Sequence, residues 1–426
     1  MTYIRIYFRT KRPLPKPQMN RHHISPRLRP LLLLLMVAAL ATSTALAAHP
    51  LAIPGADKTK VGIYIEDLRT GDVLSDVNSS TLFIPASVVK SLTAATVVTE
   101  MYPDGCFVTP VDIVGKLSSD GVLDGNIVIT VVGDPTIESR HFTAAQGFAK
   151  NAAQSIHNAG VRSIKGQVII DDTMFKDATV PHGWDPADLK YAYGAYPRGA
   201  NYRDNANGRS SIADPKALML REVTTALNDL GITVAGNRLK PAADKASTVY
   251  AHSSPRVDRI LRSLMVRSDN MMAEAMLRIL EGGGTRDEAL KLEMRLWRER
   301  GLDMDGVAIH DGSGLSRADR MSPRFLASLY RWMYNDKASR ITYSDLFPRA
   351  GRDGTMSNFL KGSRLEGRLA MKTGSMTGVQ CFGGYLLDTN GVPTHLVVVL
   401  VNDFTCPRAT LKKAIADYLL KTLPVQ

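Results

Sequence analysis

The chain has 426 residues and a formal net charge of +12 at pH 7, and it is long enough for one large core or for two domains. Its cysteines, Cys106, Cys381 and Cys406, allow at most one disulfide and lack the spacing of a zinc site, so we expect neither a disulfide framework nor a metal. The Lys and Arg residues form no stripe interleaved with aromatic residues, which argues against nucleic acid as a partner.

Residues 1–48 have the composition of a secretory signal peptide. They contain eight Lys or Arg and no Asp or Glu, an apolar run at Leu31–Leu40, and the small-residue cleavage site Ala45-Leu46-Ala47. Met19 is an alternative start, and an uncleaved membrane anchor is an alternative interpretation of the apolar run. Cleavage would lower the net charge from +12 to +4, so we expect an exported protein with at most peripheral membrane contact and weak attraction to anionic envelope polymers.

After this segment the pattern predicts a hairpin followed by a buried helix. Two strand-like runs, Val61–Leu68 and Asp72–Val77, are separated by a turn. Pro85 stands where a first helical turn favours proline, and apolar residues then recur at helical spacing as far as Val98. The helix is therefore predicted to begin near Ala86.

Residues 107–250 show short strand-like and helix-like patterns in succession, which predict an inserted α/β domain. A long ordered loop is predicted at 177–214. The expected elements are strands at Val111–Val114, Asn126–Val132 and Gly166–Asp171, and helices at Thr143–Asn158 and Lys216–Leu230.

From residue 251 to the end, the pattern predicts helices followed by a small antiparallel sheet. The expected helices run from Val257 to about Ser268, then through Leu280, and over Glu288–Arg300; the expected strands are Arg368–Gly374, Gln380–Leu387 and His395–Val401. A last helix, from Pro407 to about Lys421, is predicted to cover one face of that sheet.

A serine and a lysine three positions apart, Ser87 and Lys90, lie at the start of the helix predicted near Ala86. Residues at this spacing share a helix face, with Cβ atoms about 5–6 Å apart, so the Lys90 amine is expected beside the Ser87 hydroxyl. Apolar neighbours would lower the pKa of the amine, which makes Ser87 a candidate nucleophile with Lys90 as its base. Alone, Ser-x-x-Lys occurs by chance on many helices, so this hypothesis depends on partners elsewhere.

Two further motifs follow in the chain, Ser268-Asp269-Asn270 and Lys372-Thr373-Gly374. The three motifs in this order are the pattern of class A β-lactamases and penicillin-binding proteins. In that chemistry Ser268 can relay a proton between a lysine and the leaving nitrogen, and Asn270 can hold a substrate carbonyl. Asp269 is expected to be structural.

The last motif is expected to bind the substrate. Lys372, on an exposed strand edge, would offer positive charge to a substrate carboxylate, with the Thr373 and Ser375 hydroxyls as further donors. Gly374 would let the substrate backbone approach the strand closely. The backbone N–H groups of Ser87 and Ser375 are the expected oxyanion hole.

The mature chain resembles the low-molecular-mass class C penicillin-binding proteins of the DacB type, which are D-alanyl-D-alanine carboxypeptidases and endopeptidases. Besides the three motifs, the stretches that resemble the family are Gly133-Asp-Pro-Thr136, Ile170-Asp-Asp-Thr173, Gly183-Trp184, Asp311-Gly-Ser-Gly-Leu-Ser-Arg317 and Ala350-Gly-Arg-Asp-Gly-Thr-Met356. The resemblance implies an α/β (α+β) fold with a penicillin-binding, serine β-lactamase-like domain. It places a discontinuous DD-peptidase domain at 49–106 and 251–426, interrupted by the α/β insertion at 107–250.

The resemblance also implies a periplasmic enzyme that acts on peptidoglycan stem peptides through an acyl-enzyme on Ser87. It implies β-lactam antibiotics as covalent inhibitors and no cofactor. By local motif matching, Asp188, Tyr193 and Arg317 would bind the free amino end of a diaminopimelate-type side chain, with Thr377 also lining that pocket. The offset of 181 positions from Ser87 to Ser268 is short for the family, so a third domain is expected to be missing or reduced.

Two alternatives remain open from the residues. A β-lactamase or esterase on the same scaffold is disfavoured because no Glu-x-x-Leu-Asn loop, which holds the hydrolytic water of class A β-lactamases, lies between Ser268 and Lys372. A penicillin-sensing or wall-binding protein with a weak site is disfavoured because all three motifs are intact. Which lysine is the general base, the balance of the two peptidase activities, the oligomeric state and a Cys381–Cys406 disulfide all stay open.

Overall fold

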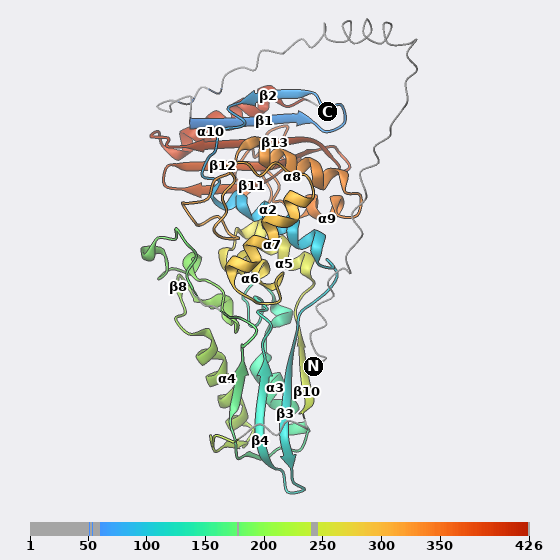
Figure 1. Ribbon diagram of the computed structural model, residues 1–426, viewed down its shortest axis with the longest axis vertical. Helices are drawn as coiled ribbons and strands as arrows, with labels where there is room; N and C mark the ends of the chain where they lie inside the picture. The colour runs from blue at the N-terminus through green and yellow to red at the C-terminus, as the bar shows by residue number, and fades with distance from the viewer. Residues whose placement is uncertain (1–50, 52, 54–59, 177–178, 240–245, 425–426) are drawn as a thin grey trace, which may run out of the picture.

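The computed structural model describes residues 51, 53, 60–176, 179–239 and 246–424. Figure 1 shows an elongated molecule with a five-stranded sheet at one end, a second sheet at the other, and a group of helices between them. This arrangement confirms the predicted mixture of an antiparallel sheet, flanking helices and an α/β insertion. The predicted signal peptide at 1–48 lies outside the described residues.

The first sheet joins the two ends of the described chain. Its strands, in the order β11-β12-β13-β1-β2, are Leu369–Met376, Val379–Leu387, Pro393–Asn402, Val61–Asp67 and Val73–Val77. All four neighbouring pairs are antiparallel, and β11 lies at the edge, with Gly374 opposite Cys381. Helix α10, Arg408–Thr422, buries Leu411 and Ile415 in the apolar cluster on one face of this sheet, as the sequence predicted.

The helical group lies against the other side of this sheet (Figure 1). Its elements are η3 (Ala86–Val88), α2 (Val89–Glu100), α5 (Val257–Arg267), α6 (Asn270–Ile279), α7 (Arg286–Glu299), α8 (Pro323–Asn335) and α9 (Arg340–Asp345). The short turn η8 (Gly354–Met356) contacts α5 and β11, and its Met356 is buried in the cluster that also contains α10. Helix α2 is buried along almost its whole length. The helix predicted to begin near Ala86 therefore starts with a 3₁₀ turn, and Ser87 lies in that turn.

Helices α8 and α9 lie in a segment for which the sequence pattern predicted no element. Helix α8 carries a recognisable start signal, because the Ser322 hydroxyl accepts a hydrogen bond from the Phe325 N–H and Pro323 occupies the first helical turn. Its buried face, which includes Phe325 and Leu329, covers β13 and β1. Helices α8 and α9 contribute buried residues to the same apolar core as α2.

The second sheet is mixed and has its own apolar core. Its strands are β3 (Val108–Leu117), β4 (Val122–Thr130), β5 (Ser163–Ile164), β6 (Val168–Asp171), β9 (Thr233–Val234) and β10 (Ala246–Ser253), and α3 (Phe148–Asn158) and α4 (Pro215–Asp229) pack on it. The helix predicted at Thr143–Asn158 is divided in two, because Gly147 at φ +86° separates η4 (Thr143–Ala145) from α3. Residue limits for the two domains stay a prediction.

The described part of the loop predicted at 177–214 is ordered by short turns. These are η5 (Pro186–Asp188), η6 (Ala192–Gly194), η7 (Arg203–Asn205) and the small hairpin β7–β8 (Ala206–Asn207 and Ser210–Ser211). The loop passes beside α6 in Figure 1 and reaches Asn270, which brings residues of the insertion next to the candidate site.

Among the described residues, no helix is both long enough and apolar enough to cross a membrane. The described part of the chain also contains no cluster of three or more His, Cys, Asp or Glu side chains arranged to hold a metal ion. The thiols of Cys106, Cys381 and Cys406 are free, so Cys381 and Cys406 are not paired in this structure.

Candidate active site

Ser87 is held in a turn that two glycines approach closely. Ala86 has a left-handed φ of +48°, which is an unusual conformation for a residue with a side chain. A Cβ atom on Gly314 would lie 2.0 Å from the Ala86 carbonyl oxygen, and a Cβ on Gly374 would lie 2.5 Å from that of Pro85. The Ser87 turn is thus fixed between the 311–317 loop and the edge strand β11.

This packing gives a different reason for Gly374 from the one that the sequence suggested. Glycine was expected there so that a substrate backbone could approach β11. The missing side chain instead leaves room for the protein's own Pro85–Ser87 turn. A larger residue would push β11 away from Ser87, so the glycine is required whether or not a substrate is bound.

The structure brings Lys90 to Ser87, as the spacing predicted. The Lys90 amine donates hydrogen bonds to Ser87 Oγ at 3.1 Å, to Asn270 Oδ1 at 2.6 Å and to the Ser313 carbonyl at 2.6 Å. These three acceptors match the three donors of a lysine ammonium group. The first and second motifs therefore meet at one amine.

Burial lowers the pKa of Lys90 from its ordinary value of 10.5 to about 8. Nearby carboxylates, of which Asp311 and Asp269 have the largest effects, oppose this shift but do not cancel it. Because the neutral amine is the form that accepts a proton, Lys90 has the character of a general base near neutral pH.

Lys372 meets Ser268 in a second serine–lysine pair. Its amine donates to Ser268 Oγ at 2.8 Å and to the Thr373 carbonyl at 2.8 Å. Ser268 has a left-handed φ of +60° at the end of α5, which directs the chain from α5 into α6. The first residue of the second motif and the first residue of the third motif thus lie within one hydrogen bond of each other.

The expectation that Lys372 lies on an exposed strand edge is wrong for its side chain. Strand β11 is an edge strand, but the Lys372 side chain is fully buried on the face that packs against the helices. This burial, together with the positive charge of Lys90, holds the pKa of Lys372 well below its usual value. Lys372 is therefore suited to exchange a proton with Ser268 rather than to present a permanent charge.

Asn270 connects the serine–lysine pairs to the inserted loop. While its Oδ1 accepts from Lys90, its Nδ2 donates to the Tyr193 carbonyl at 2.8 Å. Asp269 caps α6 by accepting a hydrogen bond from the Met272 N–H at 2.8 Å, the structural role expected for it. The helix start thereby fixes the position of Asn270.

The hydroxyl groups of Thr373 and Ser375 already have protein partners. Thr373 Oγ1 donates to Thr355 Oγ1 at 2.8 Å, and Ser375 Oγ donates to Gln380 Oε1 at 3.0 Å. Arg408 also donates to Gln380 Oε1, at 2.9 Å. A substrate carboxylate at this edge would therefore meet hydroxyl groups whose orientation is fixed by Thr355 and Gln380.

The four residues expected to bind the substrate side chain form two separate pairs, Asp188 with Tyr193 and Arg317 with Thr377. Tyr193 donates to Asp188 Oδ1 at 2.6 Å, which raises the pKa of Tyr193 to about 12. Arg317 donates to the Thr377 carbonyl at 3.2 Å. Within the described part of the chain, no hydrogen bond or ion pair joins Asp188 to Arg317, although the resemblance led us to expect them to meet.

A buried carboxylate that is not among the predicted site residues organises the 311–317 loop. Asp311 accepts hydrogen bonds from the N–H groups of Gly314 and Ser316 and from Trp184 Nε1, all within 2.8 Å. This geometry aims the Ser313 carbonyl at Lys90. Asp311 is thus a positioning residue, and Trp184 links it to the insertion.

Two stretches that resemble family sequences could have pointed to Asp311 and Thr355. Asp311 lies in the Asp-Gly-Ser-Gly stretch and Thr355 in the Gly-Thr-Met stretch, both of which resemble family sequences. Glu274 had no such signal. Its Oε1 accepts from the Gly312 N–H at 2.8 Å, and burial raises its pKa to about 7.

A comparison with family models matches the D-Ala-D-Ala carboxypeptidase 3 (S13) family over residues 42–209 and 204–420. Among curated proteins, the chain is 22% identical to D-alanyl-D-alanine carboxypeptidase DacB of Haemophilus influenzae, covering 78% of this chain and 83% of the relative. It is 25% identical to D-alanyl-D-alanine carboxypeptidase of Actinomadura sp. (strain R39), covering 82% and 79%.

Solved structures share the fold. Penicillin-binding protein 4 of Haemophilus influenzae matches with a TM-score of 0.75 at 20% identity, covering 89% of this chain and 99% of that chain. A predatory endopeptidase of Bdellovibrio bacteriovorus, acylated by penicillin G, matches with a TM-score of 0.51 at 17% identity, covering 85% and 91%.

Proposed function

Because the chain belongs to the D-Ala-D-Ala carboxypeptidase 3 (S13) family, we propose that it is a serine DD-peptidase that cleaves the D-Ala-D-Ala bond of peptidoglycan stem peptides through an acyl-enzyme on Ser87. The observation that carries this proposal is the 3.1 Å contact between the Lys90 amine and Ser87 Oγ, in a site where burial lowers the pKa of the amine to about 8. Cleavage of D-Ala-diaminopimelate cross-links is a second activity of the same site. The composition of residues 1–48 supports action in the periplasm.

In the first half of the reaction, neutral Lys90 accepts the Ser87 proton as Ser87 Oγ bonds to the carbonyl carbon of the penultimate D-Ala. The backbone N–H groups of Ser87 and Ser375 bind the resulting oxyanion, an interaction worth about 3–4 kcal/mol per donor. The C–N bond then breaks, and the leaving nitrogen takes a proton through Ser268, which Lys372 contacts at 2.8 Å. Water hydrolyses the ester in the second half and regenerates Ser87.

The same chemistry extends to β-lactams, whose ring carbonyl would acylate Ser87 and remain attached. The Haemophilus influenzae protein of the same fold has been solved with a β-lactam, and the Bdellovibrio protein has been solved acylated by penicillin G. The absence of a Glu-x-x-Leu-Asn loop between Ser268 and Lys372 supports slow release of the adduct in this chain.

Two measurements on the wild-type protein test the function. A labelled penicillin should attach covalently with a stoichiometry near one, and D-alanine should be released from a diaminopimelate pentapeptide. Rapid turnover of penicillin would favour the β-lactamase or esterase alternative. Acylation by penicillin without release of D-alanine would favour the penicillin-sensing alternative.

The rate of acylation is expected to rise with pH through about 8. With a pKa of about 8, roughly one Lys90 amine in ten is neutral at pH 7 and about nine in ten at pH 9, so the rate should increase roughly tenfold between these values. Stopped-flow measurement with a penicillin whose own ionisation is constant over this range checks the profile. A rate that is flat or falls between pH 7 and pH 9 would contradict a neutral lysine base.

We also propose that Asp188 and Tyr193 bind the side-chain amine of the substrate, with Arg317 and Thr377 beside them. Replacement Asp188→Ala should raise KM about tenfold for a diaminopimelate pentapeptide, because one charge-assisted hydrogen bond of about 1.5 kcal/mol is lost, while kcat changes little. With the side-chain amine acetylated, wild type and variant should have equal KM. Asp229→Ala, at an exposed acid on α4, is the control and should leave KM unchanged. If Asp188→Ala raised KM equally for the free and the acetylated substrate, Asp188 would not bind the side-chain amine.

A further inference from the structure

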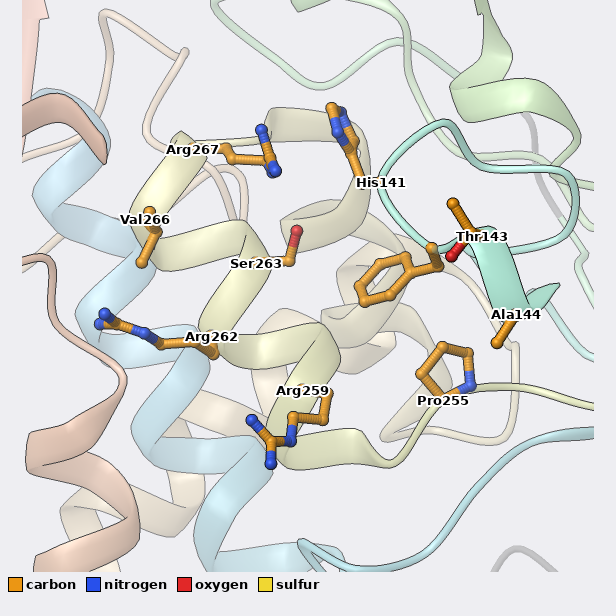
Figure 2. Close-up of a pocket in the computed structure, with 10 residues that line it drawn as sticks. His141, Thr143, Ala144, Pro255, Arg259, Arg262, Ser263, Val266 and Arg267 are labelled. Atoms are coloured by element: carbon orange, nitrogen blue, oxygen red, sulfur yellow. The ribbon is translucent and has the colours of Figure 1, made fainter. Parts of the chain in front are cut away.

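A cavity of about 480 Å³ lies beside the candidate active site, between α5 and the segment that precedes α3. Figure 2 shows α5 residues on one side of this cavity and Thr143 and Ala144 on the other. Arg267, at one end of the cavity, directly precedes Ser268 of the second motif. The cavity therefore begins next to the catalytic groups and extends away from them along α5.

The lining of the cavity is strongly basic. It contains Arg259, Arg262 and Arg267 and no Asp or Glu. His141 also lines the cavity, but burial lowers the pKa of its imidazole, so it adds little positive charge at pH 7. Arg262 is occupied, because its guanidinium donates to the Phe347 carbonyl and pairs with Asp353. Arg259 and Arg267 are exposed, and neither side chain has a hydrogen-bond or ion-pair partner among the described residues. Two unpaired positive charges thus face this cavity.

The two arginines are spaced so that an extended ligand with more than one anionic group could contact both. Arg259, Ser263 and Arg267 are four residues apart, so they lie on one face of α5, with about 12 Å between the first and the last along the helix axis. The buried Ser263 hydroxyl has no hydrogen-bond partner among the described residues and lies midway between them, on the cavity side of α5 in Figure 2.

The rest of the lining is suited to an extended organic chain. Phe142, Pro255 and Val266 add apolar walls to the cavity. A peptide that carries carboxylates at intervals would place its negative groups at Arg259 and Arg267 and its aliphatic parts against these walls. The stem peptides of peptidoglycan have this chemistry.

We propose that this cavity is a secondary binding site for carboxylate groups of a peptidoglycan stem peptide, outside the bond that is cut. The proposal rests on the proposed function for its choice of ligand. The site would hold the polymer while Ser87 acts on one of its peptides. It would therefore affect polymeric or muropeptide ligands more than a small acyl-D-Ala-D-Ala substrate, which carries fewer carboxylates.

The test measures binding when the catalytic groups are already blocked. The full chain is first acylated with penicillin, and its affinity for a fluorescent disaccharide muropeptide with a tripeptide stem is measured by anisotropy. Arg259→Glu and Arg267→Glu should each weaken binding at least tenfold, and amidation of the muropeptide carboxylates should have a similar effect on wild type. Arg298→Glu, at an exposed arginine on α7, should bind like wild type.

The outcomes separate the two proposals. Equal affinity of wild type, Arg259→Glu and Arg259→Gln would overturn the secondary site, whatever the result of acylation. Displacement of the muropeptide by inorganic phosphate, at a concentration at which free carboxylate ions do not displace it, would also overturn the proposal. That result would assign the arginines to phosphate. Failure of the acylation step itself would contradict the proposed function, and binding to the unacylated chain would then still test the cavity.

Discussion

Replacement of Ser87 by alanine is expected to abolish covalent labelling by penicillin and to lower D-alanine release by about 10⁴-fold or more. Removal of a nucleophile eliminates the covalent path and leaves only the contributions of binding and of the oxyanion donors. Mass spectrometry of the intact protein detects the adduct, and an assay of released D-alanine measures turnover.

The Ser87→Ala protein should remain folded. The Lys90 amine keeps its hydrogen bonds to Asn270 and to the Ser313 carbonyl, so only one of its three acceptors is lost. The midpoint temperature of thermal unfolding, Tm, should therefore change by only a few degrees. Ser247→Ala, at an exposed serine on β10, controls for unrelated labelling and should behave like wild type. Penicillin labelling of Ser87→Ala at another serine would refute the assignment of the nucleophile.

Replacement of Lys90 by methionine is expected to slow acylation by about 10²–10⁴-fold, the usual contribution of a positioned general base. Methionine keeps an apolar side chain of similar length in this buried place but cannot accept the Ser87 proton. The rise of the rate through pH 8 should disappear with the amine. Acylation kinetics over the pH range measure both effects.

Two comparisons make the Lys90→Met result specific. The variant leaves Asn270 Oδ1 and the Ser313 carbonyl without their donor, at a cost of roughly 1–3 kcal/mol each, so the free energy of unfolding must be measured in parallel. Lys150→Met, at an exposed lysine on α3, should be neutral. If Lys372→Met removed the pH dependence and Lys90→Met kept it, Lys372 would be the first proton acceptor.

The sequence alone determined those features that depend on local spacing. Period-two and helical patterns predicted β1, β12, β13, α4, α5 and α10 close to their observed bounds. The three-residue offset between Ser87 and Lys90 was enough to predict that they touch, because the geometry of a single turn fixes that contact. The order of the three motifs was enough to indicate the family that the comparison then matched.

The tertiary structure decided which environment each of these residues has. Whether the Lys372 side chain is buried depends on the helices that pack on β11, and whether Gly374 must be glycine depends on the Pro85–Ser87 turn about 290 positions earlier in the chain. Such contacts join distant segments, and no local period encodes them.

The same reason applies to the 311–317 loop, whose Ser313 carbonyl contacts Lys90, and to the basic cavity. Asp311 acts through the loop that it folds, and Arg259 and Arg267 become a site only because the segment before α3 closes the other side of α5. Ser87 and Lys90 could be found from their spacing. Their electrostatic environment, and with it the pKa of about 8 that makes Lys90 a base, exists only after the chain has folded and excluded water from the site.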